Sequence, residues 1–175
     1  MSREFSSGWT DVSNPPGTWA PQFALTEFEQ QYAAHPAINA VLSPNDENAA
    51  PIIQHLMQIG IKPRTFPITG QDATKLGLQY ILTGYQCGTV SKPMYLEVQA
   101  AAALAIYLRA GVASPSLAGQ VIPDPIDNRA VPAVLLTPEW VTAQNMESTV
   151  IADGFITAAQ VCKGYAAACA AAGIR

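Results

Sequence analysis

The amino-acid sequence predicts an α/β fold, an open parallel sheet with helices on both faces. Short apolar runs recur at 38–43, 65–69 and 87–91, and a segment with helical spacing of its apolar residues follows each run. Strands that alternate with helices of this length are typical of right-handed β-α-β units. With 175 residues, the chain is also long enough to bury the core of one such domain.

The first predicted element is an amphipathic helix over 21–35. The expected packing positions on this helix are Phe23, Leu25, Phe28 and Tyr32. The apolar run INAVLS at 38–43 then ends in polar residues, which is typical of a buried parallel strand.

A second helix is expected between Asp46 as its N-cap and Gly60 near its end. The next strand is TFPIT at 65–69, which is predicted despite its proline. The helix that follows, over 73–84, stops at Gly84. A third strand covers 87–91, and a long helix runs from Tyr95 to Ala110, closed by Gly111.

This alternating pattern fails at 114–138, a proline-rich segment that we interpret as a hinge-like connector within a single domain over 1–175. Its one good strand candidate is AVLL at 133–136. The tail over 139–175 contains an alanine-rich helix at about 158–172, a composition with high helix propensity.

The composition argues against several classes of protein. At 49% hydrophobic residues the chain is too apolar to be intrinsically disordered. Its net charge of -4 and dispersed basic residues make nucleic acid an unlikely partner. No apolar stretch approaches the roughly 20 residues of a membrane span. The first ten residues lack the apolar core of a secretory signal, so a chain translated from Met1 is expected in the cytoplasm.

Polar residues follow each of the three predicted strands. Asn45 comes after the first strand, Asp72 after the second and Lys92 after the third. Ligands of open parallel sheets bind beyond the carboxyl ends of the strands, so we expect these side chains to meet at one edge. An amide, a carboxylate and an ammonium group form several hydrogen bonds. With the aromatic face of Trp19 they suit a polyhydroxylated ligand such as a sugar.

These residues also have simpler structural interpretations. Asp46 and Asp72 can each cap the helix that follows, and Lys92 before a proline is typical of a solvated loop. The two histidines, His35 and His55, have no partner at metal-ligand spacing, so neither a metal nor another cofactor is expected. An enzyme with Asp72 and Lys92 as an acid–base pair ranks last, because it needs a strongly shifted pKa.

The sequence leaves the pairing of the cysteines open. On one continuous helix, Cys162 and Cys169 would be separated by about 10 Å along the axis, beyond the reach of a disulfide. A disulfide therefore requires a turn between them, which Gly164 can supply. Two separate buried thiols are the alternative.

Five segments together resemble one known family. They are WAPQFALTEFEQ, INAVLSPNDENAA, PITGQDATKLGLQYILTG, TVSKP and PAVLLTPEWVTAQNMESTVIADGF, from about Trp19 to Phe155. Their order and spacing resemble the C-terminal half of the periplasmic sugar-binding proteins of ABC importers, in the xylose-binding branch. The resemblance implies one lobe of a type I periplasmic-binding-protein fold that binds a pentose such as xylose, with no catalysis.

The resemblance also assigns the ligand contacts. Trp19 matches the tryptophan that stacks on the sugar ring, and Asn45 matches the asparagine of the N-D pair. Asp72 matches the aspartate of G-Q-D, and Lys92 matches the lysine before proline. The chain departs from the family at Ser91, where the family usually has an aromatic residue.

Members of this family have two lobes that close on the sugar and deliver it to a membrane permease, whereas the resemblance covers one lobe. It implies an N-terminal lobe and an ABC permease as partners, and a periplasmic or extracellular location if the chain is a fragment of an exported protein. The tail resembles exported actinobacterial members, which implies a disulfide between Cys162 and Cys169. The alternative is a solitary lobe that acts as an interaction module, by dimerising or by pairing with a separate N-terminal lobe through its exposed face.

Overall fold

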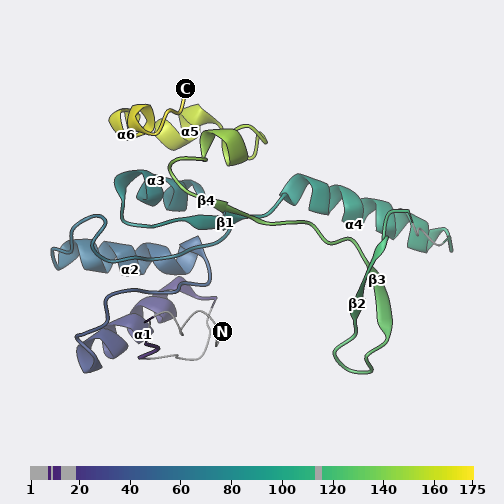
Figure 1. Cartoon of the computed structure of the whole chain (residues 1–175), viewed down its shortest axis with the longest axis horizontal. Helices are drawn as coiled ribbons and strands as arrows, with labels where there is room; N and C mark the ends of the chain where they lie inside the picture. Colours follow the sequence, from purple (N-terminus) through teal and green to yellow (C-terminus); the bar gives the residue numbers. More distant parts are fainter. Residues whose placement is uncertain (1–7, 9, 13–18, 113–115) are drawn as a thin grey trace. The chain divides into compact units, whose positions relative to one another are not determined.

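The computed structural model of the chain describes residues 8, 10–12, 19–112 and 116–175 (Figure 1). It contains two compact units. The first combines the chain up to Ser91 with Trp140–Arg175, and the second is Lys92–Glu139. The strand segments predicted at 38–43, 65–69 and 87–91 all lie in the first unit.

The strand segments of the first unit are parallel, as predicted. Val41 pairs with Ile68, and Gln71 pairs with Val90. Strand β1 (Thr89–Ser91) also pairs with β4 (Glu139–Val141). The first two segments form isolated bridges rather than long ladders, and one reason is Pro67, which has no N–H to donate beside Ile68. The α/β fold class is confirmed.

The first three helices of the first unit begin and end close to their predicted bounds. They are α1 (Pro21–Ala34), α2 (Asp46–Gln58) and α3 (Lys75–Thr83). Gly60 and Gly84 follow α2 and α3 with φ of 87° and 82°, a conformation that costs glycine little. The termination of both helices was therefore predictable from the sequence.

Two apolar clusters fill the first unit, and Figure 1 shows α1, α2 and α3 side by side around them. One cluster joins α1, α2 and the second strand segment, with Phe28 stacked on Tyr32 at 5.3 Å between ring centroids. The other joins α3 to the C-terminal segments. The prediction that Phe23 packs inward is wrong. Its side chain is 66% exposed, because the buried stripe of α1 runs through Ala24 and Phe28.

The C-terminal segment begins with a π-helix, η2 (Glu147–Ile151), and continues through α5 (Ala158–Cys162) and α6 (Ala166–Ala171). The single helix predicted at 158–172 is wrong, because the chain turns at Gly164, where φ is 84°. This turn brings the Cα atoms of Cys162 and Cys169 to 5.8 Å, and the two residues form a disulfide. The condition that a disulfide needs a turn at Gly164 is confirmed.

The second unit contains α4 (Met94–Arg109) and a hairpin of β2 (Gln120–Pro123) and β3 (Ala130–Ala133). The two strands are antiparallel. The strand predicted at 133–136 is wrong, because pairing with β2 ends at Ala133. No residue of α4 is buried. Across the described residues, no helix has both the length and the apolar character needed to span a membrane.

Candidate functional site

Asn45 lies where the first strand segment ends, and it caps α2. Its Oδ1 accepts a hydrogen bond from the backbone N–H of Asn48 at 3.0 Å, and the residue is 7% exposed. The prediction that Asp46 is the cap is wrong, since Asp46 is the first residue of the helix. Capping occupies the oxygen of Asn45, so its NH₂ group is the part suited to donate to a ligand.

Asp72 lies in the loop after the second strand segment. Its N–H donates to the carbonyl oxygen of Val90 at 2.8 Å, and its φ is 90°. Asp72 does not cap α3. Thr74 does so, accepting from the N–H of Gly77 at 3.1 Å. The half-buried Asp72 therefore belongs to the loop and not to the helix.

The loops of Asn45 and Asp72 are bonded to each other. The backbone N–H of Asp46 donates to the carbonyl oxygen of Gln71 at 3.0 Å, which joins the residue after Asn45 to the residue before Asp72. The structure thus brings two of the four predicted site residues to one edge, beyond the carboxyl ends of two parallel strand segments. This is the edge at which ligands of open parallel sheets bind.

Trp19 and Lys92 lie on other segments of the chain, before α1 and after β1. Trp19 precedes the first turn of α1, and its side chain is 74% exposed, so the face of the indole is open to a stacking partner. Lys92 is half-buried and begins the second unit.

Sequence reasoning missed the role of the Asp46 side chain. It is 1% exposed, and its carboxylate accepts hydrogen bonds from the N–H and the hydroxyl of Thr74 at 2.8 and 3.1 Å and from Nε2 of Gln86 at 2.8 Å. Burial raises the pKa of Asp46 above its ordinary value of 3.8, and hydrogen bonds from Gln86, Thr74 and Thr89 oppose that rise. The one available signal was its position beside Asn45.

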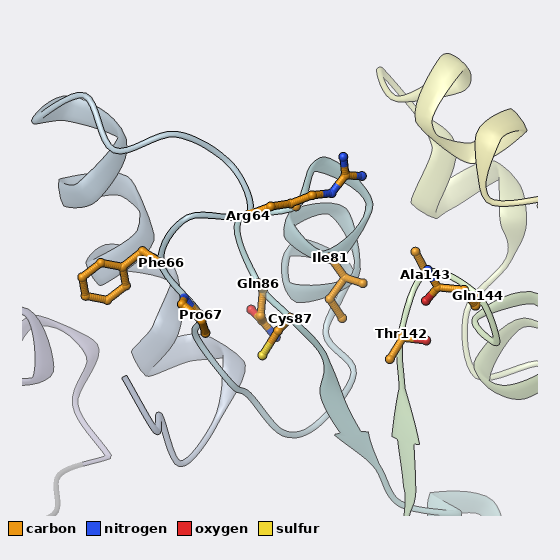
Figure 2. A pocket seen from close by; sticks show the side chains of 10 residues that line it. Arg64, Phe66, Pro67, Ile81, Gln86, Cys87, Thr142, Ala143 and Gln144 are labelled. Carbon is orange, nitrogen blue, oxygen red and sulfur yellow. The ribbon is translucent and has the colours of Figure 1, made fainter. Parts of the chain in front are cut away.

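A cavity of about 310 Å³ lies elsewhere in the first unit (Figure 2). Phe66, Gln86 and Cys87 line it and precede the paired residues of the second and third strand segments, so it lies at their amino ends. None of the four predicted site residues lines this cavity. Cys87 donates to the carbonyl oxygen of Ile68, and burial raises the pKa of its thiol, which opposes nucleophilic chemistry there. Among the described residues, no cluster of three or more His, Cys, Asp or Glu is placed to hold a metal ion.

Comparison with curated proteins gives two relatives of the same kind. The D-xylose-binding periplasmic protein of Escherichia coli (strain K12) is 36% identical over 138 residues, which cover 78% of this chain and 40% of that protein. The D-xylose-binding periplasmic protein of Haemophilus influenzae is 34% identical, over 80% of this chain and 41% of that protein. The chain thus spans about two-fifths of the length of these relatives.

Solved structures show the same fold. A carbohydrate transporter solute binding protein from Chloroflexus aurantiacus, in complex with D-glucose, is 27% identical with a TM-score of 0.66, covering 81% of this chain and 42% of that chain. An ABC transporter solute binding protein from Clostridium phytofermentans with bound β-D-glucose has a TM-score of 0.68 at 21% identity, covering 82% and 44%, and this likeness concerns the fold alone.

The family model described as "Periplasmic binding protein domain" matches residues 3–112. This range contains Trp19, Asn45, Asp72 and Lys92, and it covers more than half of the chain. On this match, the chain belongs to the periplasmic binding protein domain family.

Proposed function

We propose that the chain binds a monosaccharide of the pentose class, such as D-xylose, and catalyses no reaction on it. The observation that carries the proposal is the hydrogen bond between Asp46 and Gln71, which joins the loops of Asn45 and Asp72 at the carboxyl edge of the strand segments. Both relatives are D-xylose-binding periplasmic proteins, which supports the choice of sugar.

Each proposed contact has a distinct chemical role. The carboxylate of Asp72 accepts hydrogen bonds from two sugar hydroxyls, while the NH₂ group of Asn45 and the ammonium group of Lys92 donate to hydroxyl oxygens. The exposed indole of Trp19 stacks on the apolar face of the sugar ring. The set contains donors, an acceptor and an apolar face, which is what a polyhydroxylated ring requires.

The expected affinity is weak. One lobe supplies part of the hydrogen bonds and does not exclude water by closing, so we expect a dissociation constant of about 1 mM or above. Isothermal titration of the chain with D-xylose, D-ribose and D-glucose tests this, with Asp72→Asn expected to weaken xylose binding at least about tenfold. Asp153→Asn, which neutralises an exposed carboxylate outside the site, is the matched control.

Three outcomes contradict the proposal in different ways. Absence of saturable heat with all three sugars contradicts sugar binding itself. A dissociation constant below about 1 μM contradicts the weak binding expected of a single lobe. Turnover of a sugar that disappears in Asp72→Asn contradicts the non-catalytic role.

We propose further that the chain works as one lobe of a two-lobe binding protein, with an N-terminal lobe and an ABC permease as partners. The supporting observation is helix α4, which carries Glu97 and Arg109 as its only charged residues and has no buried residue. A helix that is apolar on all sides is normally buried, so α4 is expected to be covered in the working protein, and an N-terminal lobe is the surface we propose for it.

A second candidate function, supported by the same helix, is an interaction module in which α4 covers a second copy or a separate N-terminal lobe. Sedimentation velocity at increasing concentration tests association between copies. Wild type is expected to associate, and Ile106→Glu, at a side chain that is 70% exposed, is expected to remain monomeric. Wild type that stays strictly monomeric at high concentration contradicts this candidate.

The proposed location is the periplasm or the cell exterior. The Cys162–Cys169 disulfide supports it, because disulfides persist in oxidising compartments and are rare in reducing ones. Fractionation of the producing cells, followed by mass spectrometry of the 162–169 peptide, tests the location and the bond together. Recovery of the chain in the cytoplasm with both thiols reduced contradicts it.

A further inference from the structure

We propose that Asp46 is a positioning residue that holds the loop of Asp72 in its ligand-binding conformation. The expected effect on sugar binding rests on the proposed function. The expected effect on the conformation of the loop does not. Asp46 belongs to α2 and Asp72 to the loop before α3, so the proposal concerns how one element fixes another.

The loop needs such a support because its backbone is strained. Asp72 and Ala73 have φ of 90° and 48°, in the left-handed region that L-residues rarely adopt. Each such residue is energetically unfavourable and persists only where the surroundings hold it. Two consecutive strained residues make the orientation of Asp72 dependent on the contacts around the loop.

Three consecutive N–H groups of the loop are held from outside. The N–H of Asp72 donates to the carbonyl oxygen of Val90 at 2.8 Å, and the N–H of Ala73 donates to the hydroxyl oxygen of Thr89 at 3.2 Å. The third, of Thr74, donates to Oδ2 of Asp46 at 2.8 Å. Strand β1 therefore supports the loop from one side and Asp46 supports it from α2, the helix that Asn45 caps.

The chemistry around the Asp46 carboxylate favours an acceptor on both oxygens. Thr74 presents an N–H and a hydroxyl to Oδ2, and Gln86 presents its NH₂ group to Oδ1. In Asp46→Asn, one of these acceptor oxygens is replaced by an NH₂ group, which is a donor. This NH₂ group then faces either the donors of Thr74 or the NH₂ group of Gln86. Such a mismatch of buried groups is costly, so the site discriminates Asp from its isosteric amide.

The surrounding backbone leaves space for this carboxylate and no more. A Cβ atom at Gly70 would collide with Oδ1 of Asp46, and one at Gly77 would collide with its Oδ2. Gly70 lies in the loop and Gly77 in the first turn of α3. Asp46 is thus packed directly between the backbone of the loop and the backbone of the helix that follows it.

Hydrogen exchange measured by NMR in Asp46→Asn tests the proposal. The amide of Thr74 is expected to exchange at least about tenfold faster than in wild type, and D-xylose binding is expected to weaken by a similar factor. Glu47→Gln removes the same charge one residue later at an exposed position, and it is expected to change neither quantity. Ile53→Val is a control for a general loss of stability, because it trims a buried side chain of the same helix. In this variant, the exchange rate of Thr74 is expected to keep its wild-type ratio to the rate of global exchange.

The two readouts separate this proposal from the proposed function. Wild type that binds no sugar contradicts the proposed function, while faster exchange at Thr74 in Asp46→Asn still supports the positioning role. Wild-type exchange at Thr74 in a folded Asp46→Asn overturns the positioning role, whatever the sugar affinity.

A second variant covers the case in which Asp46→Asn does not fold. Gln86→Met removes the donor to Oδ1 and keeps both Thr74 contacts, so it is expected to give an intermediate increase in Thr74 exchange. Exchange at Thr74 that equals wild type in folded Gln86→Met then overturns the proposal.

Discussion

The side chain of Asp46 occupies space that is open because residues 70 and 77 are glycines. A larger residue at either position would collide with the Asp46 carboxylate. Gly77 is a helical residue, where alanine is normally the better choice by about 1 kcal/mol. Here a Cβ atom meets the buried carboxylate of Asp46 instead. The local preference of the helix and the packing around it therefore oppose each other at this residue.

Gly77→Ala is expected to lower the free energy of unfolding by about 1–3 kcal/mol, because the collision outweighs the gain in helix propensity. Urea denaturation measures the change. In an Asp46→Ala background the collision is absent, and the same substitution is expected to be neutral or stabilising. A stabilising Gly77→Ala in the wild-type background contradicts the packing described here.

The raised pKa of Asp46 predicts a pH dependence of stability. Because burial raises this pKa in the folded state, the folded chain binds the proton more tightly than the unfolded chain does. The contribution of Asp46 is therefore full below its unfolded pKa of 3.8 and is lost as pH rises through the folded value. Thr74, Gln86 and Thr89, which surround the carboxylate, do not titrate in this range.

The free energy of unfolding of wild type minus that of Asp46→Asn is accordingly expected to fall as pH rises from 3.8 and then to level off. Denaturation series at closely spaced pH values measure this difference. A difference that increases with pH over the same range means that hydrogen bonding outweighs burial and lowers the pKa.

At the scale of elements, the turn between α5 and α6 converts an alanine-rich segment into a disulfide-closed unit. The break at Gly164 allows Cys162 to reach Cys169, which lies within the apolar cluster against α3. The bond therefore joins α5 to α6 within the C-terminal part of the first unit. Its contribution to stability is expected to come from restricting the unfolded chain.

Replacing both Cys162 and Cys169 by alanine is expected to lower the free energy of unfolding by about 2–3 kcal/mol. Thermal unfolding with and without reductant measures the effect. In reductant, the unfolding temperature of wild type is expected to fall towards that of the double variant. The unfolding temperature of the double variant is expected to be the same with and without reductant. Cys87→Ser, which removes the free thiol, is expected to keep the sensitivity to reductant, and wild type that is insensitive contradicts the role of the bond.

The ends of α2 and α3 were predictable, because each depends on residues close together in the sequence. Gly60 and Gly84 end their helices where the pattern predicted, since positive φ is a local property. The role of Asp46 was not predictable, because its partners Thr74 and Gln86 lie 28 and 40 residues away. The hairpin was missed because the prolines of 114–138 indicated a connector, while its register is set by pairing between β2 and β3.

For the molecule as a whole, we propose that the edge holding Asn45 and Asp72 receives a monosaccharide. Two apolar clusters of the first unit, which both include residues of α3, support this edge. Hydrogen bonds of the loop fix the backbone of Asp72. Trp19 and Lys92 complete the proposed contact set, and all four ligand contacts remain predictions. The cavity at the opposite ends of the strand segments is the competing location.

The most direct test of this claim is to titrate the ¹⁵N-labelled chain with D-xylose and follow the backbone amide shifts. We predict saturable shifts at 45–46 and 70–74, together with a shift of the Trp19 indole N–H, and their loss in Asp72→Asn. No saturable shift in the 45–46 and 70–74 loops, or shifts confined to Arg64, Cys87 and Thr142 around the cavity, would contradict the account.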